Sequence, residues 1–369
     1  MRITFVLNSI GLSGGTRVVF EYANHLYQRG HDVTIVYPLM PLDKDVKWYQ
    51  DGQWYGMLKT VTKNLIQGRK PRWFDVKATV LRVPSLSERY IPDGDIIVAT
   101  WWSTAYDVAG YGPKKGEKFY LVQHYETWGG PKDTVDASYK LGLKIITVSN
   151  WIKNIIENNL NGSVAAVISN APNQNEFFPD RKTANQRVRI LTPYRKEKWK
   201  GFEDAVQVFI KVKKQHPNVK LVTFGQYSGR DIPEDFEYHQ GPIGEKLRHL
   251  YSSSDVFLFS SHSEGFGLPP MEAMACKCAV VTTNVGAIPD FSVPGETALV
   301  SPPGDIDTLA ENLLTLIEDA DKRTRFAEKG YEYIKQFTWG HSCDELETLF
   351  KTSLTTYEIN LKGSSWNMH

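Results

Sequence analysis

Short apolar runs alternate with stretches of helical periodicity along most of the chain. This alternation predicts parallel strands joined by helices, because the runs have the length of buried strands and the segments between them carry apolar residues three and four apart. The runs predicted as strands are 2–8, 31–38, 95–100, 118–123, 144–149, 164–169, 187–193, 219–225, 255–261 and 278–284. The clearest helical patterns are 16–28, 202–215, 244–251, 269–276 and 305–318. The sequence therefore predicts an α/β protein.

The length of the chain and a polar stretch near its middle predict two domains. The 369 residues can bury two cores, since domains mostly settle near ~100–200 residues. The polar stretch 179–187 is the expected linker. We expect two doubly wound, Rossmann-like domains that face each other, at 1–182 and 183–342, with ligands at the carboxyl ends of the strands. A long amphipathic helix at the end of the chain, within 343–369, is expected to pack back and brace them.

Composition excludes several classes of protein. The 43 Lys and Arg residues nearly balance the 42 Asp and Glu residues, so no global field favours nucleic acid as a partner. Cys276, Cys278 and Cys343 are too few and too badly spaced for a disulfide framework or a four-ligand zinc site. The sequence shows no signal-peptide core and no apolar stretch of roughly 18 residues. We expect a cytoplasmic monomer, peripheral at most to the inner face of the membrane.

Segment 57–82 is rich in lysine and arginine, with Asp75 as its one acidic residue and Trp73 and Phe74 interleaved. Two interpretations stay open for this segment. It is either an ordinary solvated helix followed by a loop, or a patch that grips an anionic acceptor or a membrane surface.

A glycine-rich turn follows the first predicted strand. Glycines let a backbone approach a phosphate, and the start of the next helix favours negative charge, so Gly14 and Gly15 are candidate phosphate contacts. A tight turn without a ligand is the alternative. The dinucleotide fingerprint is missing after every predicted strand, which argues against a nicotinamide dehydrogenase. The turn fits a serine nucleophile elbow, but no neighbouring segment supplies an oxyanion motif.

The strongest motif spans 262–275, between a predicted strand and a predicted helix. Glu264 precedes a glycine turn, and Glu272 lies near the start of a helix opened by two prolines, where a carboxylate suits the helix dipole. Backbone amides between the two glutamates would point toward a bound phosphate. The residues predicted to form this diphospho-sugar socket are Gly265, Phe266, Gly267, Leu268 and Glu272.

Two cations follow the first predicted strand of the second domain. Arg195 and Lys200 are cations that can neutralise the charge of an anion bound at this strand end. A solvated basic turn is the alternative for this pair.

These motifs resemble those of the retaining glycosyltransferases with the GT-B fold in the large family numbered four, whose members carry an E-x7-E motif. Glu264 and Glu272 have that spacing. The family's N-terminal glycine loop, its interdomain segment and its basic segment for the donor diphosphate also have counterparts in this chain. The matching residues are Gly14, Gly15, Arg17, Asn170, Phe178, Pro179, Arg195 and Lys200. The chain departs from the family where Lys277 replaces a common glycine.

The resemblance implies roles for single residues. Glu272 would bind the ribose hydroxyls, and Glu264 would face the donor sugar, with front-face attack and the departing phosphate as proton acceptor. The family often places a histidine near the C6 hydroxyl of that sugar, so His124 and Glu264 are the expected catalytic residues, with a structural histidine as the alternative. Ser149 resembles a family serine at the end of the following strand.

The resemblance also implies a reaction. A hexose or deoxyhexose would pass from a UDP-, dTDP- or GDP-linked donor to a glycan or lipid-linked acceptor, as in bacterial surface-polysaccharide assembly. No cofactor is expected. No required metal is expected either, because the Asp-x-Asp pairs of this chain lie in turns or at helix starts and enzymes with the GT-B fold generally use cationic side chains instead. The alternatives are a catalytically silent regulatory protein that binds nucleotide sugars, and a GT-B epimerase or phosphorylase. Candidate acceptor contacts, with core packing as their alternative, are Trp101, Trp102, Tyr106, Tyr125 and Trp128.

Overall fold

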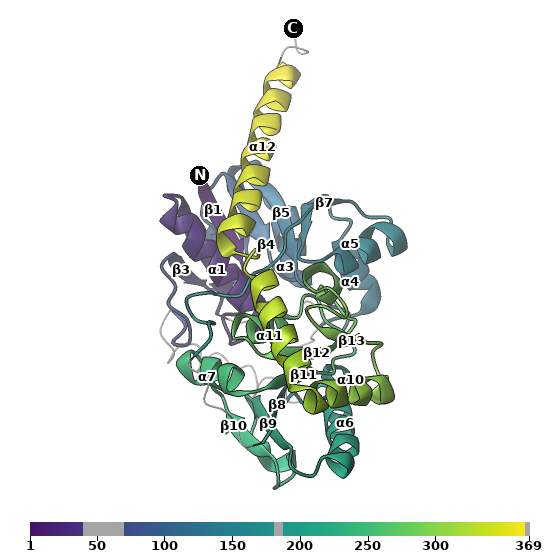
Figure 1. Ribbon diagram of the computed structural model, residues 1–369. Helices are drawn as coiled ribbons and strands as arrows, with labels where there is room; N and C mark the ends of the chain where they lie inside the picture. Colours follow the sequence, from purple (N-terminus) through teal and green to yellow (C-terminus); the bar gives the residue numbers. More distant parts are fainter. Residues whose placement is uncertain (40–69, 181–186, 366–369) are drawn as a thin grey trace. The chain divides into compact units, whose positions relative to one another are not determined.

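The computed structural model describes residues 1–39, 70–180 and 187–365, with side chains described as far as residue 356. Two units separate along the chain: Met1–Ser169 with Trp339–His369, and Asn170–Thr338. Each unit contains one sheet of parallel strands with helices around it (Figure 1), which confirms the predicted α/β class. Residues 57–69, the first half of the basic segment 57–82, lie outside the described residues. In the described part of the chain, no helix has the length and apolar character needed to cross a membrane.

The sheet of the first unit has the strand order β3-β2-β1-β4-β5-β6-β7, and its neighbouring strands are parallel. Its strands are β1 (Arg2–Val6), β2 (Asp32–Pro38), β3 (Thr79–Val83), β4 (Ile96–Ala99), β5 (Glu117–Val122), β6 (Lys144–Thr147) and β7 (Val164–Val167). The helices used below are α1 (Gly14–Gln28), α3 (Trp102–Gly110), α4 (Lys132–Ser138), α5 (Asn150–Asn154) and α12 (Trp339–Ser365). The order reverses between β1 and β4, where α/β sheets of this kind bind ligands.

The second unit repeats this plan with the order β10-β9-β8-β11-β12-β13, again with parallel neighbours. Its strands are β8 (Arg189–Pro193), β9 (Lys220–Gly225), β10 (Glu237–Gln240), β11 (Val256–Phe259), β12 (Ala279–Thr283) and β13 (Leu299–Ser301). Its helices are α6 (Phe202–Gln215), α7 (Glu245–Ser253), α8 (Leu268–Ala275), α9 (Ile288–Phe291), α10 (Ile306–Glu318) and α11 (Ala320–Ile334). The reversal lies between β8 and β11, so the loops after these strands open next to each other.

Three strands, β3, β10 and β13, were not predicted from the apolar periodicity. Each is an edge strand of its sheet or lies next to polar sequence, so its side chains do not form an uninterrupted apolar run. β10 reads EYHQ and β13 has three residues, and neither pattern can be distinguished from a loop by periodicity.

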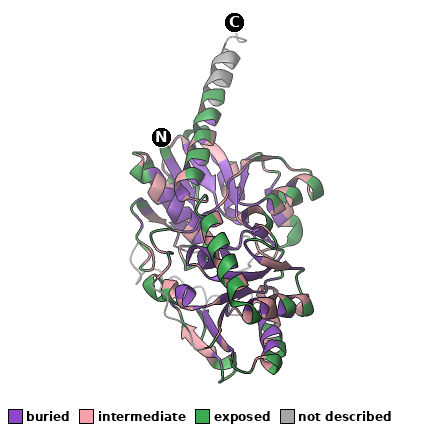
Figure 2. Cartoon of the chain, viewed as in Figure 1, coloured by how far each residue is buried: buried purple, intermediate pink, exposed green. Residues whose placement is uncertain are grey.

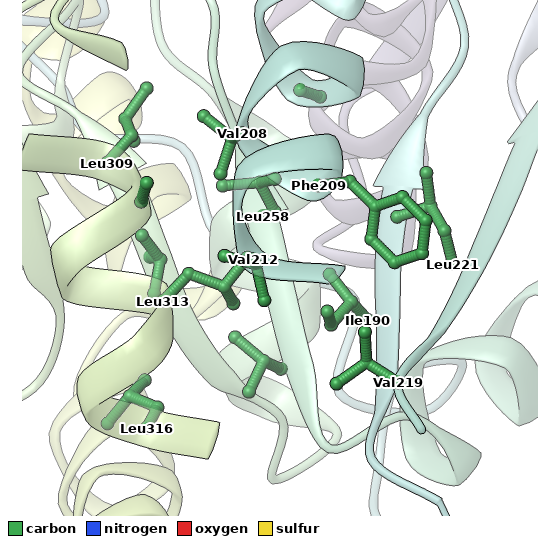
Figure 3. Close-up of a cluster of buried hydrophobic side chains, with 14 of the residues drawn as sticks. Ile190, Val208, Phe209, Val212, Val219, Leu221, Leu258, Leu309, Leu313 and Leu316 are labelled. Atoms are coloured by element: carbon green, nitrogen blue, oxygen red, sulfur yellow. The ribbon is translucent and has the colours of Figure 1, made fainter. Parts of the chain in front are cut away.

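The core of the second unit is packed between its sheet and two helices (Figure 3). Apolar residues of α6 and α10 recur three and four positions apart, so each helix buries one stripe against the strands. The buried residues that meet there are Ile190, Val208, Phe209, Val212, Leu221, Leu258, Leu309, Leu313 and Leu316. Buried residues concentrate in the strands of both sheets, while many of the helices, such as α10 and α11, also carry exposed residues (Figure 2).

The boundary between the units lies earlier in the chain than the predicted boundary at 182. Residues from Asn170 onward belong to the second unit. Asp180 accepts a hydrogen bond from Arg248 at 3.0 Å, and its backbone amide donates to the Ser252 hydroxyl. Phe177 is buried with its ring 5.9 Å from that of Tyr251. The predicted linker 179–187 therefore begins within the second unit, where Asp180 is hydrogen-bonded to α7.

The end of the chain returns to the first unit as α12, which begins at Trp339, four residues before the predicted start. The first turns of the yellow helix in Figure 1 lie against α1. Arg29 forms ion pairs with Asp344 (2.8 Å) and Glu347 (3.0 Å), and Phe350 packs 4.8 Å from Phe119 of β5. The final helix is therefore an integral part of the first unit.

Glu237 is the centre of an ion network at the polar edge of the second sheet. Its carboxylate accepts hydrogen bonds from Lys220, from His239 (2.7 Å) and from Arg189 (3.2 Å). Partial burial by itself raises the pKa of Glu237, but the hydrogen bonds from Lys220, His239 and Arg189 outweigh that effect and lower the pKa to about 2.

We expect Glu237→Gln to lower the free energy of unfolding by about 1–2 kcal/mol at pH 7, a value discounted for partial solvent screening. A pKa that is lower in the folded state stabilises the fold above the unfolded pKa of about 4.5. That stabilisation is lost as the pH falls toward 2, so the difference between wild type and variant should narrow there. Urea unfolding between pH 7 and pH 3 measures it, with the exposed Glu234→Gln as the control. A difference that is independent of pH would contradict the prediction.

Candidate functional site

The two motif glutamates flank a tight loop between β11 and α8. Gly267 caps α8 with φ +100°, a conformation that favours glycine. A Cβ atom at Gly286 would lie 2.9 Å from the Glu264 Cβ, and φ at Gly286 is +58°. The Ala287 amide donates to the Phe266 carbonyl at 3.0 Å. The segment after β12 therefore packs directly against Glu264 and fixes the course of its loop.

The start of α8 has few amide donors. Pro269 and Pro270 have no N–H group, so the donors that can face an anion are the amides up to Leu268. This agrees with the amides that the sequence singles out between the two glutamates. An anion at this helix start would need cationic side chains to complete its coordination.

Glu272 lies within α8 and is buried, with 8% of its surface exposed. The hydroxyl of Tyr251, on α7, donates to its Oε2 at 3.0 Å. Burial, followed by the nearby Glu272 carboxylate, raises the pKa of Tyr251 well above its ordinary value, so this hydroxyl remains a proton donor. The Arg195 charge opposes part of that rise, so Arg195 lies near enough to act on the pair.

The loop after β8 is fastened to the end of β11. His262 donates its backbone amide to the Trp199 carbonyl at 2.7 Å, and the Ser260 hydroxyl donates to the Gly201 carbonyl at 2.6 Å. Gly201 has φ +66°, and a Cβ atom there would lie 1.9 Å from the Ser260 carbonyl oxygen. Only glycine therefore fits at position 201. The contact places Lys200 beside the loop between β11 and α8.

Lys200 and Glu264 form an ion pair with 2.9 Å between Nζ and Oε2. Both side chains are largely buried, with 24% and 13% of their surfaces exposed. Arg195 is half-buried, and within the described ranges no acidic side chain forms an ion pair with it. The charge of Lys200 is thus already neutralised by Glu264, whereas the charge of Arg195 is available to a ligand.

In the first unit, the glycine turn is part of α1, since the helix begins at Gly14 and not at residue 16. Ser13 caps the helix, and its hydroxyl oxygen accepts from the Thr16 amide at 3.1 Å. The Gln123 side chain donates to the Gly15 carbonyl at 3.1 Å. This hydrogen bond joins the first turn of α1 to the loop after β5.

His124 lies in that same loop, at the carboxyl end of β5. Its Nδ1 lies 3.0 Å from the Tyr125 carbonyl oxygen, which can only accept, so Nδ1 carries the proton. Nε2 lies on the opposite side of the ring from this contact. The rings of Trp128 and Trp151 stand edge-on to the imidazole, at 6.3 and 5.8 Å between centroids.

The structure brings most of the predicted donor residues together in the second unit, at the carboxyl ends of β8 and β11. These are Arg195, Lys200, Glu264, Gly265, Phe266, Gly267, Leu268 and Glu272. Gly14, Gly15 and His124 belong to the first unit. Sequence reasoning did not identify Tyr251, Gly201 or Gly286 as parts of the site. Their roles depend on long-range contacts that no local spacing reveals.

The Asp-x-Asp pairs have structural partners. Asp305 and Asp319 cap α10 and α11 by accepting hydrogen bonds from backbone amides three residues later. Asp93 pairs with Lys115 at 2.7 Å. Among the residues that the structure describes, no three His, Cys, Asp or Glu side chains are grouped as metal ligands would be.

Comparison with known sequences identifies the second unit. Residues 173–333 match the family described as glycosyl transferases group 1. The capsular polysaccharide biosynthesis glycosyltransferase CapM of Staphylococcus aureus is 30% identical over 173 residues, which cover 43% of this chain. The match spans 44% of CapM, less than half the length of that relative.

Comparison with solved structures extends over both units. Sucrose-phosphate synthase from Thermosynechococcus elongatus superposes with a TM-score of 0.72 and 15% identity, covering 96% of this chain and 99% of that one. HepE of Anabaena, solved in complex with UDP-glucose, gives a TM-score of 0.71 at 15% identity, covering 96% and 100%. These likenesses identify the fold. Residues 173–333 therefore carry the sequence pattern of the glycosyl transferases group 1 family, and the chain as a whole has the GT-B fold.

Proposed function

We propose that this protein is a retaining, metal-independent glycosyltransferase that takes a hexose or deoxyhexose from a nucleotide-diphosphate sugar. The observation that carries the proposal is the Lys200–Glu264 ion pair beside the start of the short helix α8. It joins a cation suited to a diphosphate with a carboxylate suited to sugar hydroxyls within one built site.

Each residue of the second unit has a role in this proposal. Arg195 and Lys200 neutralise the diphosphate as charge accumulates on the leaving group, and the amides at the start of α8 donate to its oxygens. Lys200 exchanges its resting partner Glu264 for the phosphate, which frees the carboxylate to bind the donor sugar. Glu272, oriented by Tyr251, accepts hydrogen bonds from the ribose hydroxyls.

The nature of donor and acceptor is supported by the relatives. CapM is named for capsular polysaccharide biosynthesis, and HepE was solved with UDP-glucose. We propose a glycan or lipid-linked saccharide acceptor in surface-polysaccharide assembly, with UDP, dTDP or GDP as the nucleotide carrier. His124, whose Nδ1 is engaged by the Tyr125 carbonyl, is proposed to contact the donor sugar through Nε2.

Thermal unfolding with UDP, dTDP, GDP and their diphospho-sugars tests the donor site. At about 100 times its Kd, the correct nucleotide should raise the melting temperature of wild type by about 5 °C. Glu272→Ala should lose most of that increase, because it removes the acceptor for the ribose. Glu311→Ala, at an exposed position of α10, is the matched control and should keep the full increase.

Two further results discriminate between functions. Release of nucleoside diphosphate from the stabilising donor indicates an enzyme, whereas stabilisation without donor consumption identifies a silent nucleotide-sugar-binding protein. If no nucleotide at millimolar concentration stabilises wild type against thermal unfolding, the proposal of a donor site in the second unit is wrong.

A further inference from the structure

The loop after β5, residues 123–130, is fastened by its own side chains to three helices. Gln123 binds the first turn of α1, and Tyr125 donates its hydroxyl to Asp136 of α4 at 2.7 Å. Glu126 accepts the backbone amide of Trp102, the first residue of α3, at 2.9 Å. The loop is therefore held in one conformation at several points along its length.

The outward side of this loop carries a pair of indoles. The Trp128 ring is 5.1 Å from that of Trp101 in an edge-to-face arrangement, and 55% of Trp128 is exposed. A Cβ atom at Gly129 would lie 2.4 Å from Trp101, and one at Gly130 would lie 2.6 Å from Trp102. The two glycines therefore let the loop lie flat against both indoles, and neither adds a side chain beside Trp128.

We propose that Trp128, supported by Trp101 and adjacent to His124, is the surface on which a pyranose ring of the acceptor stacks. The inference rests on the proposed glycosyl transfer and extends it to the acceptor. A pyranose presents an apolar C–H face that suits an exposed indole and hydroxyls that suit the neighbouring imidazole. A ring stacked on Trp128 lies within reach of His124, since their ring centroids are 6.3 Å apart.

The ion pair next to the platform is compatible with a neutral ligand. Lys132 and Asp136, on α4, form an ion pair with each other at 2.5 Å, and Asp136 also accepts from Tyr125. Their charges are therefore balanced locally. Of the other aromatic candidates, Trp102 is 1% exposed and belongs to the core, and Tyr106 donates its hydroxyl to the Thr134 carbonyl. Trp102 is thus excluded as a direct contact.

Glu126 is the positioning residue of this platform. It is 2% exposed, and its carboxyl group links the loop to the start of α3, which follows Trp101 directly. Burial raises the pKa of Glu126 well above its ordinary value, although the Trp102 amide opposes the shift. A glutamine at this position retains a carbonyl oxygen that accepts the same amide, whereas alanine removes the link.

Fluorine NMR of protein labelled with 5-fluorotryptophan tests the inference without a known substrate. The Trp128→Phe and Trp101→Phe variants assign the two resonances. Wild type is titrated with methyl α-glucopyranoside, methyl α-mannopyranoside and methyl α-rhamnopyranoside, and with glycerol as the control for non-specific effects. We expect at least one pyranoside to shift the Trp128 resonance saturably, while the tryptophan resonances other than those of Trp128 and Trp101 stay fixed. Glu126→Gln should keep that response, and Glu126→Ala should weaken the apparent affinity about 10-fold.

Other outcomes overturn the inference. No saturable shift with any pyranoside, or shifts that match those of glycerol, would exclude a sugar platform. A response to phosphatidylglycerol vesicles but not to the pyranosides would assign the indoles to a lipid surface. An equal response in Glu126→Ala would remove the positioning role alone. Nucleotide-induced thermal stabilisation tests the donor site in the second unit separately. Stabilisation without a pyranoside response would contradict the platform alone. Absence of stabilisation would contradict the proposed function.

Discussion

Gly201→Ala is expected to destabilise the second unit by about 3 kcal/mol or more, because the new methyl group meets backbone and not a side chain that could rotate away. The added Cβ atom would lie 1.9 Å from the Ser260 carbonyl oxygen, and that oxygen belongs to backbone that leaves the central strand β11. The left-handed φ of +66° adds a cost of about 1 kcal/mol for a residue with a Cβ atom. Relief requires the loop that carries Lys200 to move away from the strand. Urea unfolding and nucleotide binding measure the two consequences.

Gly295→Ala separates backbone strain from the steric clash. Gly295 has a similar φ of +79° in the same unit, and a Cβ atom there meets nothing within 4 Å. It should therefore lose about 1 kcal/mol and keep nucleotide binding. Similar losses in both variants would mean that the contact between Gly201 and Ser260 is unimportant.

Lys200→Gln is expected to slow donor turnover about 100-fold or more, which corresponds to roughly 3 kcal/mol of transition-state stabilisation. The charge on the departing diphosphate grows during bond cleavage, and a neutral amide cannot balance it. The variant also leaves Glu264, which is 13% exposed, without its cation. Release of nucleoside diphosphate from the donor found by thermal unfolding gives the rate, with water as acceptor until a better one is known.

Two variants isolate the role of the Lys200 charge. Lys198→Gln changes an exposed lysine of the same turn and should retain wild-type turnover. The double variant Lys200→Gln with Glu264→Gln also removes the carboxylate that the single variant leaves without its cation. Its free energy of unfolding should therefore be closer to that of wild type than the single variant's is, while its turnover stays low. Turnover of Lys200→Gln within about threefold of wild type would contradict the assigned role.

The sequence predicts those parts of the site that follow each other along the chain. Glu264 and Glu272 are separated by one turn and the first residues of one helix, so their spacing encodes their placement directly. Tyr251 reaches Glu272 from another helix, and Gly286 reaches Glu264 from another loop. Only tertiary packing determines these contacts, and an isolated tyrosine or glycine carries no signal of its partner.

A departure from the family pattern has a local physical explanation. Lys277, where the family commonly has glycine, adopts φ +56° just after α8. Its ammonium group pairs with Glu328 at 2.8 Å and lies 4.9 Å from the centre of the Tyr331 ring. Both partners lie on α11, so these contacts offset part of the cost of a left-handed conformation for a residue with a Cβ atom. The sequence identifies the substitution, but only the structure supplies its compensation.

The return of α12 to the first unit has a consequence for the order in which the protein can be made. Residues 170–338 are one uninterrupted segment, inserted between two pieces of the first unit. Because synthesis proceeds from the amino terminus, this segment can complete its sheet before Phe350 exists to pack against Phe119. The first unit can therefore be completed only after residues 170–338 have been synthesised. Its apolar surface beneath α12 stays exposed to solvent until that helix has been made.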